Sequence, residues 1–138
     1  MRLLIAVVRW NFMQTYIFIA GILAIIVGAI HSVLGEILIF RQMRVSGIIP
    51  TNGAPLLKER HVRILWASWH IVTVFGWAFA AIILRLTFPT DDGSFQTFVK
   101  HTIIASMLAS ALLVLFGTKG RHPGWLGLAA VAVLIWLT

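Results

Sequence analysis

Four residues whose side chains can ligate a metal or carry a proton lie in or beside apolar stretches of the sequence: His31, Glu36, His70 and His122. Imidazole and carboxylate groups suit Zn, Fe, Mn or Cu(II), and they also accept and release protons. Ionisable groups at membrane depth are costly unless they are paired or hydrated, so each is a functional candidate. The four side chains predict a His/Glu site, with a transition metal as its favoured ligand.

The sequence contains no cysteine, which excludes thiolate metal ligands, cysteine catalysis and disulfides. Because structural zinc sites commonly use thiolates, this absence argues against a closed structural zinc site. The sequence also contains no P-loop, GxSxG, HExxH or potassium-filter string. No familiar enzyme motif therefore assigns an activity.

The positions of two histidines predict similar depths on neighbouring antiparallel helices. His31 lies about nine residues, or roughly 13 Å, from the inner end of its apolar segment, and His70 lies about six residues into the next segment from the same side. Glu36 follows His31 by five residues, a rotation of about 140° in a regular helix, which weakens a simple chelate by this pair. We expect the two histidines to face each other as principal ligands, with Glu36 as a carboxylate ligand or proton acceptor and His122 as a fourth ligand.

Each of the two histidines lies on a helical face with its own composition. His70 belongs to a stripe with 4, 3, 4, 3 spacing that should point into the protein and that consists of Glu59, Arg63, Trp66, His70 and Thr73. His31 lies on a face of small residues, including Gly28 and Gly35, which permits close approach of a neighbouring helix. The two faces predict a site on the cytoplasmic third of adjacent helices.

The same residues support other interpretations that the sequence leaves open. His31 and His70 can be the axial ligands of a b-type haem, with Trp66 in the wall of the pocket, or part of a quinone-binding redox subunit. A cluster of His31, Glu36 and His70 can conduct protons or ions in an oligomer. Alternatively, the histidines are hydrogen-bonded packing groups of a structural accessory subunit in a membrane complex.

Apolar segments must position these residues, because the chain is 60% hydrophobic and only 11% charged, with a mean hydropathy of +0.98. A spanning helix takes about 20 apolar residues plus a loop, so 138 residues hold four spans. We expect an all-α integral membrane protein in which four transmembrane helices form an antiparallel bundle in the lipid bilayer. The single domain over residues 1–138 has predicted spans at about 16–40, 64–84, 98–117 and 124–138.

The remaining segments connect or flank these spans. Residues 1–11 are expected to form an interfacial segment with Trp10 at headgroup level. Residues 41–63 combine turn-forming Gly and Pro with basic side chains, which predicts a basic inner loop. The last span is short, roughly 22 Å at 1.5 Å per residue.

Lysine and arginine residues divide unequally between the two sides of the predicted membrane domain. The positive-inside rule places the richer side in the cytoplasm and both termini in the periplasm. The net charge of +7 is therefore a topology signal, and no nucleic acid is expected as a partner. Partners other than lipid would be further copies of the chain or a larger membrane complex. The richer side carries Arg41, Arg44, Lys58, Arg60, Arg63, Lys119 and Arg121, and the other carries Arg2, Arg9, Arg85 and Lys100.

Three short strings carry a resemblance to other proteins: His31-Ser-Val-Leu-Gly-Glu36, Trp66-Ala-Ser-Trp-His70 and Arg121-His-Pro-Gly-Trp125. The chain resembles, over most of its length, small four-span bacterial inner-membrane proteins of unassigned function. The resemblance implies a compact membrane bundle in the bacterial inner membrane and names no activity.

Overall fold

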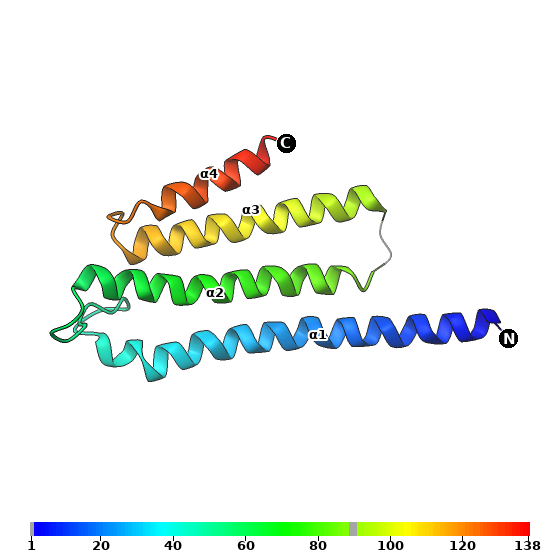
Figure 1. The fold of residues 1–138 in the computed structure, drawn as a ribbon, viewed down its shortest axis with the longest axis horizontal. Helices are drawn as coiled ribbons and strands as arrows, with labels where there is room; N and C mark the ends of the chain where they lie inside the picture. The colour runs from blue at the N-terminus through cyan, green and yellow to red at the C-terminus, as the bar shows by residue number, and fades with distance from the viewer. Residues whose placement is uncertain (1, 89–90) are drawn as a thin grey trace.

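The chain is built almost entirely from α-helices, as the computed structural model shows for residues 2–88 and 91–138 (Figure 1). Side chains are described for residues 13–88, 91 and 93–138. The elements in order are α1 (Arg2–Leu38), the short 3₁₀ helix η1 (Phe40–Met43), α2 (Glu59–Arg85), α3 (Asp92–Gly117) and α4 (Gly124–Trp136). Within the described residues, β pairing is limited to one antiparallel bridge between Gly53 and Leu57. The predicted all-α class is confirmed.

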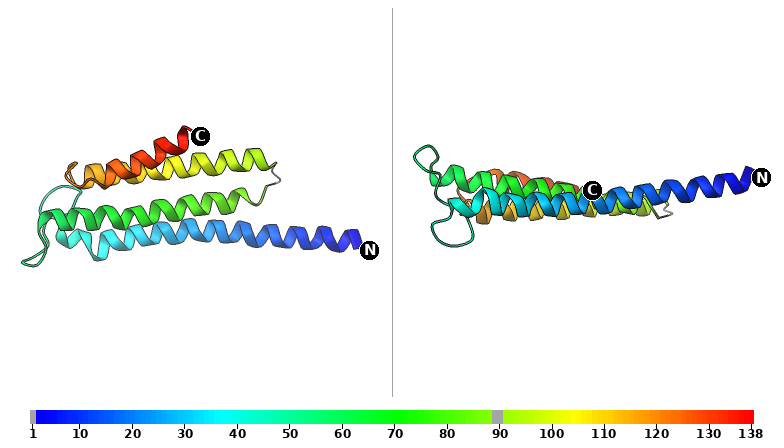
Figure 2. Two further views of the ribbon diagram at one scale, coloured as in Figure 1. Left: turned by 45° about the horizontal axis from the view of Figure 1, so that its top comes forward. Right: turned by 90° about the horizontal axis from the view of Figure 1, so that it is seen from below.

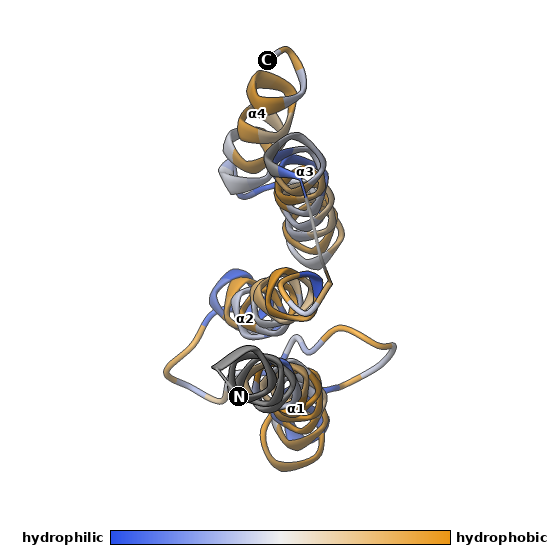
Figure 3. Cartoon of the chain, turned by 90° about the vertical axis from the view of Figure 1, so that its right-hand side faces the viewer, coloured by the Kyte–Doolittle hydropathy of each residue, from blue (hydrophilic) through white to orange (hydrophobic). Residues whose placement is uncertain are grey.

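The four helices lie side by side in sequence order and alternate in direction (Figures 1 and 2). Contacts join α1 to α2, α2 to α3 and α3 to α4. Seen end-on, the helices form an open row with α1 and α4 at opposite edges (Figure 3). The predicted antiparallel order is confirmed. In this open row α4 packs against α3 and lies at the edge opposite α1 (Figure 3).

Among the described residues, three helical segments are long and apolar enough to cross a membrane: Met13–Leu38, Glu59–Arg85 and Gly93–Gly117. The predicted spans 64–84 and 98–117 fall inside the second and third of these segments. The fourth helix has only 13 residues, or about 20 Å, which is less than the roughly 30 Å of a bilayer's hydrocarbon core. By length and composition, therefore, three helices are full-length candidate spans and α4 is a short apolar helix.

The first helix is longer than the predicted span of residues 16–40. It begins at Arg2 and ends at Leu38, so the segment predicted to be interfacial is helical over residues 2–11 and continuous with the span. No glycine or proline lies between Arg2 and Ala20, so nothing interrupts the helix there. The predicted headgroup position of Trp10 concerns a side chain outside those described.

Large apolar residues are exposed along the helices, whose ribbons are coloured as hydrophobic over much of their length (Figure 3). On α1, Val27 is 57% exposed, and on α4, Leu134 and Trp136 are 64% and 72% exposed. Soluble domains rarely expose apolar surface that is continuous over several helices. The exposed faces therefore fit contact with lipid.

Close approach between α1 and α2 depends on three glycines of α1, which are seven residues apart. A Cβ atom added at Gly28 would lie 2.7 Å from the indole Nε1 of Trp77, and one added at Gly35 would overlap the indole of Trp69. Small residues at such an interface let large side chains of the neighbouring helix reach the backbone. In order along α1, Gly21, Gly28 and Gly35 face Leu84, Trp77 and Trp69.

Candidate functional site

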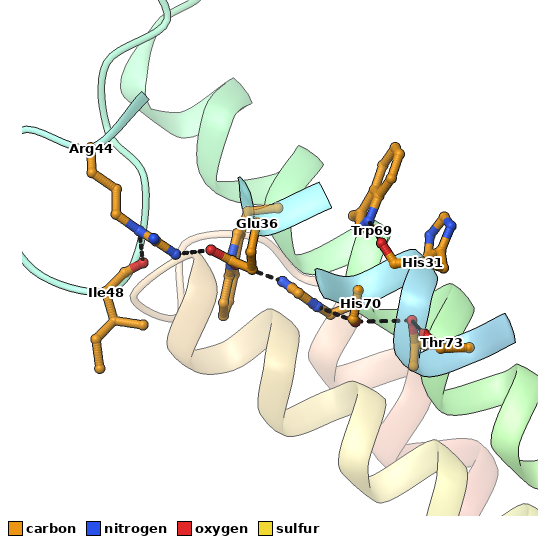
Figure 4. Close-up of polar contacts among 10 residues, drawn as sticks. His31, Glu36, Arg44, Ile48, Trp69, His70 and Thr73 are labelled. Carbon is orange, nitrogen blue, oxygen red and sulfur yellow. Dashed lines mark hydrogen bonds and ion pairs between the residues drawn. The ribbon is translucent and has the colours of Figure 1, made fainter. Parts of the chain in front are cut away.

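The centre of the site is the carboxylate of Glu36, in the last turn of α1 (Figure 4). Its Oε1 accepts hydrogen bonds from Trp66 Nε1 at 2.6 Å and from His70 Nε2 at 2.9 Å. Its Oε2 accepts from the guanidinium of Arg44. Hydrogen bonds to a charged group are the stronger ones, and three donors on one carboxylate stabilise its ionised form. Glu36 therefore joins α1, α2 and the loop after η1.

Arg44 reaches Glu36 because the chain folds back after α1. The backbone N–H groups of Thr51 and Asn52 both donate to the carbonyl oxygen of Met43, at 3.0 and 2.8 Å. Arg44 also donates from its Nε to the carbonyl oxygen of Ile48. These bonds hold the start of the basic loop against the C-terminal end of α1.

A chain of hydrogen bonds runs from His70 toward the middle of α1 (Figure 4). His70 Nδ1 lies 2.8 Å from Ser32 Oγ, which lies 3.0 Å from Thr73 Oγ1. The Thr73 hydroxyl donates to the carbonyl oxygen of Gly28 at 3.2 Å. His70 is thus bonded on both ring nitrogens, once to an acid and once to a hydroxyl.

Counting protons along this chain determines which protonation state satisfies every contact. A carbonyl oxygen can only accept, so Thr73 uses its hydroxyl proton on Gly28, and Ser32 must then donate to Thr73. The contact between Ser32 and His70 consequently needs a proton on Nδ1. With Glu36 ionised, the remaining contact needs a proton on Nε2 as well. An ionised carboxylate and a neutral imidazole together hold one proton. Every contact in the chain has a donor only when the Glu36–His70 pair holds two.

His31 lies beside the chain but does not join it. Its ring stacks on that of Trp69, with centroids 4.3 Å apart and planes 9° apart, and the Trp69 indole donates to the His31 carbonyl oxygen at 3.0 Å. Its Nε2 is buried and has no hydrogen-bond partner in the part of the chain that the structure describes. We expected His31 and His70 to face each other, but each histidine has its own partners: Trp69 for His31, and Glu36 and Ser32 for His70. Adjacent residues of α2 point in different directions, so Trp69 meets His31 while His70 meets Glu36.

His122 lies outside the cluster, in the turn before α4. It lines a separate pocket together with Glu59 and Arg63, and its Nδ1 accepts a hydrogen bond from the backbone of Gly124 at 3.1 Å. The predicted convergence of His122 on His31, Glu36 and His70 is not formed, because α4 lies at the edge of the row opposite α1. Among the described residues, no group of three or more His, Cys, Asp or Glu could hold a metal ion.

Trp66, predicted as part of the wall of a haem pocket, donates a hydrogen bond to Glu36 in the cluster. Its ring also meets that of His70 edge to face, with centroids 4.8 Å apart. The cluster forms part of a groove of about 330 Å³ that reaches α3 at Leu113. Prediction from the sequence missed three hydrogen-bonding residues of the cluster: Arg44, which donates to Glu36, and Ser32 and Thr73, which continue the chain from His70. The available signal was that a lone acid in an apolar helix requires a nearby cation or donors.

The order Glu36, His70, Ser32 is also the acid, base and nucleophile order of serine hydrolases. Ser32, however, lies inside α1, where neighbouring backbone N–H groups donate along the helix and cannot form an oxyanion hole. Its hydroxyl is also bonded to Thr73. The geometry therefore fits proton exchange better than covalent catalysis.

Over the residues that the structure describes, the fold and the cluster together define a helical protein with three helices long and apolar enough to cross a membrane and a polar chain between the first two. Compared with known proteins, the chain matches no family model, no curated protein and no solved structure.

Proposed function

We propose that this chain is a multi-pass protein of the bacterial inner membrane with four spans and with both termini in the periplasm. In the antiparallel order, α1 runs toward the end of the row that holds the basic loop, and the short α4 runs away from that end (Figure 1). The larger group of lysine and arginine side chains lies at the end with the basic loop, which supports a cytoplasmic location for that end. The short α4 is the fourth span in this proposal.

Within this protein, Glu36 and His70 act as a proton-binding couple that exchanges protons between the inner surface and the hydroxyl chain. The observation that carries this proposal is the run of bonds from Glu36 through His70, Ser32 and Thr73 to the Gly28 carbonyl. The run is satisfied at every contact only when the couple holds an extra proton. Because the carboxylate also accepts from Arg44 and Trp66, its contact with His70 uses a ring N–H as donor.

A second copy of the chain, or a partner, is required to carry protons across the whole membrane. The bonded run ends at the carbonyl of Gly28, near the middle of the Met13–Leu38 span. The groove beside Glu36 and His70 opens between α1, α2 and α3, where such a neighbour can supply the next polar group. We therefore propose that proton transfer occurs in an oligomer or complex.

Proton flux in liposomes tests this function. Purified protein is reconstituted with a trapped pH-sensitive dye, and a potassium gradient with valinomycin sets the potential. Glu36→Gln and His70→Gln should each abolish the protein-dependent flux, whereas His31→Gln, outside the bonded run, should retain it. Flux that persists at the wild-type rate in both Glu36→Gln and His70→Gln would overturn the proposal.

A transition metal (Zn, Fe, Mn or Cu) at Glu36 and His70 is the second candidate. Glu36 Oε1 and His70 Nε2 lie 2.9 Å apart, close enough for one cation to contact both. Two protein ligands are fewer than the three or four of known zinc sites, so this candidate needs ligands from a second copy. Elemental analysis of purified protein tests it: a stoichiometric metal that is lost in His70→Ala and kept in His122→Ala would favour metal binding. Haem b between His31 and His70 has no such support, because the His31 ring stacks on Trp69 and both ring nitrogens of His70 are already in hydrogen bonds.

A further inference from the structure

A second, strongly basic pocket lies at the inner ends of α2 and α3 and the start of α4. Its volume is about 550 Å³, within the range of small-molecule sites. Four cationic side chains and one carboxylate line it, so it carries a net charge of +3 with its histidines neutral. The cations are Arg60, Arg63, Lys119 and Arg121, and the carboxylate is Glu59. The Glu36–His70 cluster is not part of this pocket.

The wall of the pocket is fixed by Arg63. This residue is 8% exposed, and it donates from Nε to Glu59 at 2.7 Å and from a terminal nitrogen to the carbonyl oxygen of Gly117 at 3.1 Å. These bonds tie the start of α2 to the end of α3. Lys119 lies 3.8 Å from the same Glu59 carboxylate. The single acid of the pocket is thus shared by two cations.

The turn between α3 and α4 supplies the other side of the pocket. Lys119 and Gly120 both have positive φ, at 55° and 71°, and the backbone N–H of Gly120 donates to the carbonyl oxygen of Leu115 at 2.8 Å. A lysine in this left-handed region is held there by its surroundings. In the described part of the chain, the guanidinium of Arg121 has no hydrogen bond or ion pair with a protein acceptor. It therefore retains its donors for a ligand.

We infer that this pocket binds a phosphate-type anion, and that its occupant is the phosphate headgroup of an anionic membrane lipid. Guanidinium groups match phosphate oxygens in a forked geometry, and the excess positive charge lacks a compensating acid. The pocket lies at the ends of candidate spans, where headgroups are located in a bilayer. Basic pockets between helices on the cytoplasmic side are typical positions for lipid phosphate. This site is independent of the proposed proton couple.

Lipid binding to the purified protein in a mild detergent tests the inference. Thermal unfolding is measured at rising concentrations of short-chain phosphatidylglycerol, of phosphatidylcholine and, in a separate arm, of inorganic phosphate, because a ligand that binds the folded state raises its stability. Arg60→Gln and Arg121→Gln remove exposed cations of the pocket. Arg41→Gln removes an exposed cation at the same end of the protein but outside the pocket.

We expect saturable stabilisation by phosphatidylglycerol and little by phosphatidylcholine. Each pocket variant should weaken phosphatidylglycerol binding roughly fivefold, and the double variant about 25-fold, whereas Arg41→Gln should bind like the wild type. Inorganic phosphate that binds with the same dependence on Arg121 would support the anion pocket and assign a soluble ion as its source. Equal binding by the wild type and both pocket variants, or equal weakening by Arg41→Gln, would overturn the inference. Unfolding temperatures without lipid show whether the variants are folded.

Discussion

The indole of Trp69 occupies the space that a side chain at Gly35 would need. The indole N–H donates to the His31 carbonyl oxygen at 3.0 Å, and the indole ring stacks on the His31 ring. This arrangement holds α2 against α1. Trp69 and Gly35 directly precede His70 and Glu36 in the sequence, so the packing lies next to the Glu36–His70 hydrogen bond. The absence of a Cβ atom at one position therefore contributes directly to the geometry of the polar cluster.

Gly35→Ala should destabilise the protein, because a new Cβ atom displaces the Trp69 indole and breaks its bond to His31. We expect the free energy of unfolding to fall by roughly 1 to 3 kcal/mol, as for other overpacked cores. Gly76→Ala is the matched control, since nothing lies within 4 Å of a Cβ atom added there. In a helix this control should be neutral or should add up to about 1 kcal/mol. Tryptophan fluorescence during detergent-induced unfolding measures both; equal stability of the two variants would contradict the role of Gly35.

Trp66→Phe should weaken the Glu36 cluster while keeping an aromatic ring in place. The change removes one of three donors to the carboxylate, and hydrogen bonds to charged groups contribute about 1.5 to 3 kcal/mol. Trp77→Phe removes an indole bond to a neutral carbonyl, that of Ile25, so it should cost less, about 1 kcal/mol. The same unfolding assay compares the two variants. A larger loss for Trp77→Phe would argue that the Trp66 bond is weak.

Ser32→Ala should interrupt the hydrogen-bonded run between His70 and Thr73. Positioned proton-transfer groups typically contribute 10² or more to a rate, so the liposome flux should fall by roughly 100-fold. Thr102→Val is a suitable control, because the Thr102 hydroxyl donates to the Phe98 carbonyl of its own helix at 2.9 Å. Unchanged flux in Ser32→Ala would mean that protons leave the Glu36–His70 couple by another route.

Asp91 should make the start of α3 sensitive to acid. The backbone N–H of Ser94 donates to the Asp91 carboxylate, and this bond, with further help from the Ser94 hydroxyl and Arg85, lowers the pKa of Asp91. Since the folded-state pKa is lowered, the capping contribution is fully present above the ordinary pKa of an aspartate, about 4, and is lost as the pH falls through the folded value. Helical circular dichroism and thermal unfolding between pH 6 and about 3 measure this loss.

Asp91→Asn provides the comparison for this acid sensitivity. Asparagine also caps helices but does not titrate, so the variant should keep α3 and lose the Asp91-dependent part of the pH response. An identical pH response in the wild type and Asp91→Asn would assign the acid sensitivity to other groups.

Several features of the protein were predictable from the order of its residues. Apolar runs of helical length, separated by glycine, proline and charged residues, predicted the existence of α2 and α3 and where they end, because burial of such runs in lipid leaves helices as the favoured structure. Both helices begin earlier than predicted, and α2 begins at Glu59, inside the predicted loop 41–63. The 3.6-residue period placed Trp66, His70 and Thr73 on one face of α2. The same period put Glu36 about 140° around the helix from His31, and the two residues have separate partners.

Which faces meet was decided only by tertiary structure. Helical periodicity fixes the faces of each helix separately, but the rotation of α2 against α1 depends on where large side chains fit beside small ones, as Trp69 does beside Gly35. That rotation directs His70 to Glu36 and Ser32 and leaves His31 against Trp69. The fold-back after η1, which brings Arg44 to Glu36, and the open row, which separates His122 from the cluster, depend on contacts between segments far apart in the sequence. A pattern read along one helix carries no information about those contacts, so the partners of each ionisable group emerged only from the packed helices.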